Sequence, residues 1–157
     1  MRKTFYDQKT LSLITPEDYL RRHPTNQVAA PAASSWGEEG YLRVWLNEKN
    51  EWIYPHLHAA QERMTELARR FPHPDARTDR ALKQAARELL LAQASDWPFI
   101  LRTGTSPEYA RTRVKEHLMR FTALYDQMTR SGVDEKWLEK IEGADNIFPG
   151  VDYRYWR

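Results

Sequence analysis

The chain has no cysteine, only six glycines and no long apolar run among its 157 residues. Without cysteine it can form no disulfide, no thiolate metal site and no cysteine nucleophile. Its longest apolar stretch, Leu89–Ala92, is far shorter than the roughly 20 residues that a membrane-spanning helix needs. Polar residues follow Met1 where a secretory signal would have an apolar stretch. These absences predict a cytoplasmic protein with no membrane partner.

An excess of charge of one sign is also missing. The chain has 24 Lys+Arg against 22 Asp+Glu, a formal net charge of +2. Basic and acidic residues are interspersed along the chain, so we expect no basic face and no nucleic-acid partner. Only the arginine content supports a helical nucleic-acid-binding protein, the weakest of the hypotheses considered. The length suits one domain, and 41% hydrophobic with 29% charged residues is typical of a folded one.

Several common catalytic and metal-binding motifs are absent. The sequence has no Gly-x-Gly-x-x-Gly, no Walker loop and no Gly-x-Ser-x-Gly. His56 and His58 are two positions apart and would not share a helix face, while His23, His73 and His117 are scattered. We therefore interpret the histidines as packed or surface residues and predict no metal site and no cofactor.

Apolar spacing predicts three long helices, over about 50–71, 79–94 and 106–130, and a short one over 134–143. Ser106 with Pro107 and Asp134 are start signals, and Gly132 and Gly143 are stop signals. The fold class predicted is all-α, a helical bundle of three long helices plus short ones. The expected apolar stripes are Leu57, Ala60, Met64, Leu67 and Phe71; Leu82, Ala86, Leu89, Leu90 and Gln93; and Ala110, Val114, His117, Phe121, Leu124 and Met128.

Residues 1–35 are predicted to be an irregular N-terminal segment that precedes a helical domain over 36–157. Residues 10–14 alternate weakly, as a short strand would. Thr15 and Pro16 are typical of a helix start, and His23-Pro24 would end that helix. The small-residue connector over 28–35 suggests the tail of a larger protein.

Aromatic residues are abundant, with 6 Trp, 8 Tyr and 5 Phe. Trp36 and Trp45 lie with two glycines in the segment 34–47, Ser-Ser-Trp-Gly-Glu-Glu-Gly-Tyr-Leu-Arg-Val-Trp-Leu-Asn, outside the long helices. Glycine lets the backbone approach a ligand, and the apolar face of an indole can stack on a sugar ring. Composition leaves open whether these indoles bind a ligand or cap the core. At Asp96-Trp97 it favours a helix-terminal turn with a buried indole.

Several separated segments resemble the C-terminal helical region of the family-57 glycoside hydrolases, most closely that of their 1,4-α-glucan (glycogen) branching enzymes. They are SSWGEEGY (34–41), VWLN (44–47), AARELLLAQASDW (85–97), TGT (103–105) and DNIFPGVDY (145–153). The resemblance runs from about residue 15 to the end of the chain.

The resemblance implies that a (β/α)7 barrel supplies the chemistry and that the helical region packs against it, closing one side of a glucan cleft. The family reaction is retaining: a Glu nucleophile and an Asp acid/base cleave an α-1,4 linkage, and a sugar 6-hydroxyl accepts the chain. Both carboxylates come from barrel segments that precede the residues seen here. We therefore expect no catalytic residue in this chain, residues 1–35 to include the end of a missing barrel domain, and two partners: an α-glucan resembling amylose or glycogen, and a family-57 barrel in cis or in trans.

Three residues match substrate-binding positions of the family. Trp36 and Trp45 match tryptophans that line the glucan cleft, and Asp96 matches a carboxylate that hydrogen-bonds sugar hydroxyls. The alternative is a stand-alone helical carbohydrate-binding or adaptor module without catalytic activity. Three further aromatic residues are interpreted as packing: Tyr41, Trp52 and Trp97.

Overall fold

The computed structural model describes residues 10–157, and residues 1–9 of the predicted N-terminal segment lie outside this range. The chain divides into two compact units, Met1–Ala33 and Ser34–Arg157. In the first unit, helix α2 (Pro16–Arg22) begins as the sequence predicts, because the hydroxyl of Thr15 accepts a hydrogen bond from the Asp18 amide at 3.1 Å.

The short strand expected over residues 10–14 is wrong. These residues have no regular secondary structure, and no strand occurs anywhere in residues 10–157. A single alternating segment forms a strand only when a neighbouring strand completes its hydrogen bonds, and the described part of the chain offers none. All regular secondary structure in the second unit is helical, which confirms the all-α prediction.

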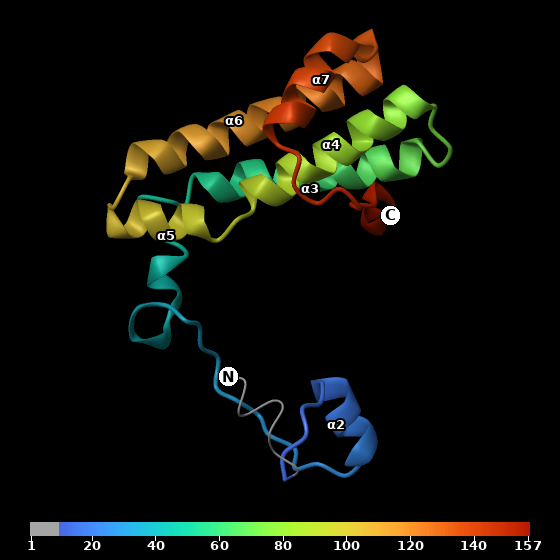
Figure 1. Ribbon diagram of the computed structural model, residues 1–157. Coiled ribbons are helices and arrows are strands. Elements are labelled where there is room, and N and C mark those ends of the chain that lie inside the picture. Colours follow the sequence, from blue (N-terminus) through green and yellow to red (C-terminus); the bar gives the residue numbers. More distant parts are fainter. Residues whose placement is uncertain (1–9) are drawn as a thin grey trace. The chain divides into compact units, whose positions relative to one another are not determined.

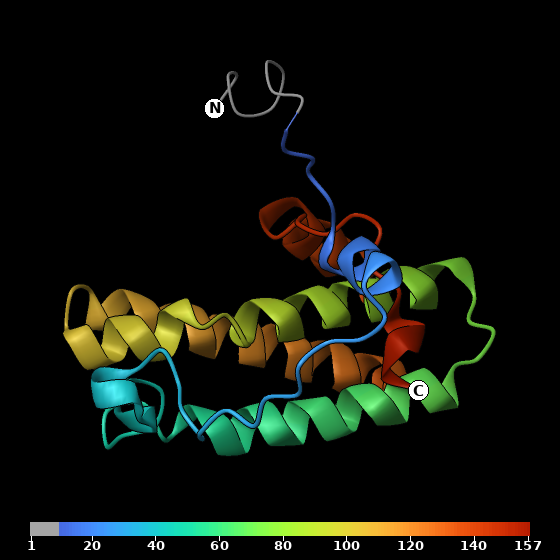
Figure 2. The same cartoon turned by 90° about the horizontal axis from the view of Figure 1, so that it is seen from below.

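Three long helices run along one another to form the body of the second unit (Figures 1 and 2). Beyond them, the chain continues α6 with a π-helical turn, η3, and ends in a short helix and a 3-10 turn. The elements of this body are α3 (Ile53–Arg70), α4 (Ala76–Ala92), α6 (Pro107–Asp126), η3 (Gln127–Ser131), α7 (Glu135–Ala144) and η4 (Tyr153–Trp156).

Helix α4 begins three residues earlier than the apolar stripe indicates. Asp75 caps it, since its carboxylate accepts a hydrogen bond from the Thr78 amide at 2.8 Å. Asp134 caps α7 in the same way, with the Trp137 amide at 3.1 Å. Polar capping residues therefore set these helix starts, ahead of the first buried side chain.

A further helix, α5 (Asp96–Thr103), lies between the helices predicted over 79–94 and 106–130, where only a helix-terminal turn was expected. Pro98 lies in its first turn, where a missing amide hydrogen removes no intrahelical bond. Gly104 ends the helix in the left-handed region at φ 76°. Trp97 is buried and donates its indole N–H to the Leu91 carbonyl at 2.7 Å, which fixes α5 to the end of α4.

In residues 10–157 the core consists of two hydrophobic clusters, and most residues of the predicted stripes lie in or against them. Leu90 and Gln93 are exceptions, because they are only half-buried and belong to neither cluster, and the buried His117 contacts polar side chains instead. The larger one joins α3, α4, α6 and α7 around Met64, Leu82 and Phe121. The smaller one joins the start of α3 to α5 and α6 around Leu57 and Leu101. The smaller cluster therefore holds α5 in place at one end of the bundle. No helix within residues 10–157 is long and apolar enough to cross a membrane.

Candidate functional site

The segment 35–50, here called the aromatic loop, precedes α3 and lies next to α5 (Figure 1). It contains two short 3-10 turns, η1 (Glu38–Gly40) and η2 (Leu42–Val44). Ser35 closes the first part of the loop: its hydroxyl donates to the Tyr41 carbonyl at 2.6 Å, and its amide donates to the Gly40 carbonyl at 2.7 Å.

Gly37 lies where the loop passes closest to itself. A Cβ atom at this position would be 2.2 Å from the Tyr41 carbonyl oxygen and 2.9 Å from the Ser35 hydroxyl oxygen. Any side chain would therefore force the backbone to move. The close approach explains one of the two glycines that the sequence places between Trp36 and Trp45.

Three aromatic rings meet between the aromatic loop and α5. The ring centroids of Trp36, Trp45 and Phe99 are 6.4 Å apart in each pair, and Trp36 and Phe99 are stacked with an interplanar angle of 19°. These distances are typical of aromatic pairs. Trp36 is nevertheless 84% exposed, so one indole remains open to solvent.

These rings line a pocket of about 200 Å³, here called the aromatic pocket, together with Ser95 and Asp96. The structure thus brings all three residues that the resemblance singled out, Trp36, Trp45 and Asp96, to one pocket. The alternative in which both indoles cap the core does not describe Trp36.

Asp96 is the first residue of α5 and is exposed. Within residues 10–157 its carboxylate takes part in no hydrogen bond or ion pair with another side chain. A carboxylate at a helix N-terminus is favoured by the helix dipole. Both of its oxygen atoms can therefore accept hydrogen bonds from a ligand in the pocket.

Phe99 and Ser95 were not predicted as site residues. Phe99 lies three positions after Asp96, which places the two on the same face of α5. Phe99 can be assigned to the site only when α5 is predicted to be a helix. Pro98 is typical of a break in a helix, so the sequence did not indicate α5. Ser95 carries no comparable signal in the sequence.

The three aromatic residues interpreted as packing differ from one another. Trp97 is buried, and Trp52 is half-buried against the smaller core cluster. Tyr41 is 65% exposed, so the packing interpretation is wrong for this residue. The Ser35 hydroxyl donates a hydrogen bond to the backbone carbonyl of Tyr41, and the Tyr41 ring is exposed to solvent.

Two side chains hold the aromatic loop from outside it. Arg102 of α5 forms an ion pair with Glu38 at 2.6 Å, and its hydrogen bond and charge lower the pKa of the Glu38 carboxyl. Tyr54 of α3 donates its hydroxyl to the Trp45 carbonyl, and burial raises the pKa of that hydroxyl. The loop is thus attached to both helices that flank it.

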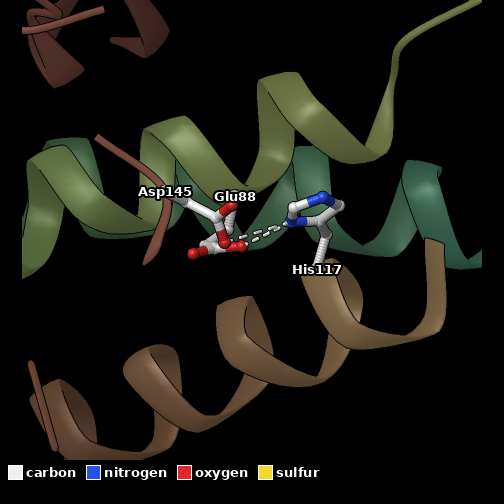
Figure 3. Close-up of side chains that lie close together, drawn as sticks. All are labelled: Glu88, His117 and Asp145. Atoms are coloured by element: carbon white, nitrogen blue, oxygen red, sulfur yellow. Dashed lines mark hydrogen bonds and ion pairs between the residues drawn. The ribbon is translucent and has the colours of Figure 1, made fainter. Parts of the chain in front are cut away.

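A second group of polar residues, here called the polar cluster, consists of Glu88, His117 and Asp145 (Figure 3). The side chains come from α4, from α6 and from the segment after α7, and they point toward one another. His117 Nδ1 lies 2.7 Å from a Glu88 oxygen and 3.8 Å from an Asp145 oxygen. Glu88 and His117 are fully buried, and Asp145 nearly so.

One His and two carboxylates are metal-ligating residue types, but here their ligand atoms are already engaged. Asp145 is paired with Arg113 at 3.3 Å and with Arg120. Glu88 accepts a hydrogen bond from Gln84 at 2.8 Å on its other oxygen. Two guanidinium groups beside the carboxylate oppose a cation, and the free ring nitrogen of His117, Nε2, is not the one that faces the carboxylates. The polar cluster is a structural network that ties three segments together.

Comparison with known proteins identifies the family. Residues 56–156 match the family described as "1,4-alpha-glucan branching enzyme, C-terminal". The chain belongs to this family. The match begins after Trp36 and Trp45 and includes Asp96.

Similar proteins include the 1,4-alpha-glucan branching enzyme TK1436 of Thermococcus kodakarensis, 41% identical over 121 residues, which are 74% of this chain and 18% of that protein. Its crystal structure in complex with glucose and additives aligns with 90% of this chain and 27% of its own, at a TM-score of 0.79 and 34% identity. The GH57-type branching enzyme of Pyrococcus horikoshii aligns over 96% of this chain and 29% of its own, at 0.77 and 34%.

A protein with a different description is also similar. The structure of the alpha-amylase AmyC of Thermotoga maritima aligns over 98% of this chain and 28% of its own, at a TM-score of 0.72 and 39% identity. The chain therefore spans less than a third of the length of each of these relatives. It corresponds to the C-terminal domain of a GH57 branching enzyme.

Proposed function

We propose that this branching-enzyme C-terminal domain forms one side of the α-glucan cleft of a retaining 1,4-α-glucan branching enzyme. The enzyme would cleave an α-1,4 linkage and transfer the released chain to a sugar 6-hydroxyl. The observation that carries the proposal is the aromatic pocket, where two indoles, a phenyl ring and an unpaired carboxylate meet at the surface.

The chemistry of the aromatic pocket suits a sugar chain. A glucose ring has apolar C–H faces and a rim of hydroxyl groups. The exposed indole of Trp36 offers an apolar face, and the Asp96 carboxylate can accept hydrogen bonds from the hydroxyls. Hydrogen bonds to a charged acceptor are stronger than those between neutral groups, so Asp96 would orient the chain as well as bind it.

This chain would contribute binding and orientation, and the barrel would contribute the reacting carboxylates. A retaining mechanism needs two carboxyl groups about 5–5.5 Å apart on either side of the scissile bond. In the described residues, Glu88 and Asp145 lie close together, but both are buried and engaged with other side chains. They are not available to a substrate, which supports placing the catalytic pair outside this chain.

The exposed apolar residues of the aromatic loop support a barrel partner. Tyr41, Leu42 and Leu46 are exposed in addition to Trp36. A cluster of exposed apolar side chains is typical of a surface that another domain covers. A family-57 barrel, in the same polypeptide or in a separate one, would cover this surface and complete the cleft.

Reconstitution tests the proposal. The chain is assayed on amylose alone and joined to a family-57 barrel that lacks its own C-terminal domain, with new α-1,6 linkages measured after debranching. We expect no activity from the chain alone and branch formation by the joined protein. If the chain binds amylose but the joined protein forms no branches, the chain is instead a stand-alone carbohydrate-binding module.

Hydrolysis is a second candidate, favoured by the similarity to AmyC. In that reaction water takes the place of the sugar hydroxyl as acceptor. The same assay distinguishes the two, because hydrolysis raises the number of reducing ends and forms no α-1,6 linkage.

A further inference from the structure

The aromatic pocket is assembled from two segments that are far apart in the sequence. Trp36 and Trp45 come from the aromatic loop, whereas Asp96 and Phe99 come from α5. The pocket therefore exists only while the loop keeps its position against α5. We propose that Asn50 is the positioning residue that fixes this relation. Its expected effect on glucan binding rests on the function proposed above.

Asn50 is fully buried and uses both ends of its amide. Its Nδ2 donates to the Val44 carbonyl at 2.9 Å and to the Pro98 carbonyl at 3.2 Å. Its Oδ1 accepts a hydrogen bond from the Asn47 amide at 2.8 Å. Both N–H donors of the side chain are thus satisfied, one by the loop and one by α5.

Each of the two accepting carbonyls lies immediately before a residue whose ring lines the aromatic pocket. The Val44 carbonyl belongs to the peptide group that joins Val44 to Trp45, and the Pro98 carbonyl belongs to the one that joins Pro98 to Phe99. A peptide group is planar and rigid, so fixing its oxygen restricts the Cα atom that follows. One buried amide therefore holds the backbone that leads into two of the three pocket rings.

The other attachments of the loop do not replace this link. Within the described residues, the remaining side-chain hydrogen bond between the loop and α5 is that of Arg102 with Glu38, which is exposed on both sides. Exposed ion pairs contribute little to holding two segments together. Tyr54 binds the Trp45 carbonyl but belongs to α3, so it leaves α5 unconstrained.

Replacing Asn50 by alanine in the 157-residue chain tests the proposal. Asn47 provides the matched control, because its Nδ2 bonds only to carbonyls of the loop itself, those of Arg43 at 2.8 Å and Val44 at 3.3 Å. The first measurement is near-ultraviolet circular dichroism. The difference between the spectra of the wild type and Trp36→Ala defines the Trp36 component, which reports how the three rings are arranged. We expect Asn50→Ala to lose this component with its far-ultraviolet spectrum unchanged, and Asn47→Ala to keep it.

The second measurement is titration with maltoheptaose. We expect Asn50→Ala to raise the Kd by on the order of tenfold and Asn47→Ala to change it by less than about twofold. In a Phe99→Ala background the Asn50→Ala change should be largely lost, because residues that act through one site are not additive. A purely structural role would give the same change in both backgrounds.

A second variant covers the case in which the alanine variant does not fold. Asn50→Ser keeps a small polar group near the Asn47 amide but cannot reach both carbonyls, and the same changes are expected. If the wild type binds no maltoheptaose but Asn50→Ala still loses the Trp36 component, the glucan proposal fails and the positioning role stands. The positioning role is overturned if a folded Asn50 variant keeps the component and the affinity, if Asn47→Ala has an equal effect, or if neither Asn50 variant folds.

Discussion

The aromatic pocket and the polar cluster both combine carboxylates with rings, but they differ in how the carboxylates are engaged. In the polar cluster, each carboxylate is buried and satisfied by a histidine, an amide or a guanidinium. In the aromatic pocket, Asp96 is exposed, and none of the described residues pairs with it. Residue type alone therefore does not distinguish a structural cluster from a binding site, whereas unused hydrogen-bonding capacity at an accessible surface does.

The two regions should therefore fail differently when altered. Removing one partner of a buried ionic network leaves an uncompensated charge in a poorly solvated place. Removing an exposed and unpaired group leaves the fold intact and takes away only its ligand contacts. Stability should report on the polar cluster, and binding on the aromatic pocket.

The largest expected effect is the loss of folding stability when the polar cluster is altered. Glu88→Ala removes the acceptor of both His117 and Gln84 and should lower the free energy of unfolding by about 3–5 kcal/mol. Urea denaturation followed by circular dichroism measures this. Glu62→Gln, at an exposed position of α3, is the control and should change little. An equally small effect of Glu88→Ala would show that the cluster is not structural.

Trp97 and Trp36 are the same residue type, but the first is buried and the second is exposed, so their removal should have different effects. Trp97→Ala removes a buried side chain and should cost about 3–5 kcal/mol of stability. Trp36→Ala removes an indole that is 84% exposed and should change stability by less than about 0.5 kcal/mol. Thermal melting gives the first quantity. Branching activity of the chain joined to its barrel should fall with Trp36→Ala although melting stays near normal.

If Trp36→Ala and Trp45→Ala instead lower stability and activity in proportion, the two indoles are core residues and the aromatic pocket is not a binding site. Trp45 is half-buried, so a moderate loss of stability is expected there.

Asp96→Ala should affect ligand binding alone. The carboxylate has no partner among the described residues, so the melting temperature should stay close to that of the wild type. Loss of charge-assisted hydrogen bonds to sugar hydroxyls should weaken transition-state binding by roughly 1.5–3 kcal/mol. The kcat/KM of the joined enzyme on amylose measures this, with Asp96→Asn as the isosteric control. A large fall in melting temperature would assign Asp96 to a structural turn.

The smallest effect concerns a third kind of carboxylate, that of Asp152, which is half-buried and paired with an exposed arginine. Hydrogen bonds from Arg154 lower the pKa of Asp152 from 3.8 to about 2. Because the folded pKa is depressed, its stabilisation is present above about pH 4 and is lost as the pH falls toward about 2. Asp152→Asn should remove a small part of the acid sensitivity in melting experiments. An unchanged pH profile would show that the pairing contributes nothing measurable.

Much of the fold could be predicted because it depends on local patterns. The stripe that contains Met64 and Leu67, like the one that contains Phe121 and Leu124, appears directly in the spacing of apolar residues and fills the core. Helix α5 was missed because Pro98 is typical of a break, and only its position in the first turn makes it compatible with a helix.

The site was predictable only as far as the resemblance reached. It pointed to Trp36, Trp45 and Asp96, which share a pocket, but not to Phe99, whose position depends on α5. Asn50 could not be found from the sequence, because its partner Pro98 is 48 positions away. His117 is part of a predicted stripe, yet its bond to Glu88 joins residues 29 positions apart and depends on how α4 and α6 pack.

The crowded position of Gly37 gives a rule for choosing among homologous chains and for designing variant libraries. Because a Cβ atom there would lie 2.2 Å from the Tyr41 carbonyl oxygen, a homologue with any other residue at this position must have a loop of different shape. Glu38, by contrast, can be randomised at the cost of one exposed ion pair. Libraries intended to alter which sugar chains are accepted should therefore vary Glu38 and leave both Gly37 and Gly40 unchanged, because Gly40 has a φ of 78° that favours glycine.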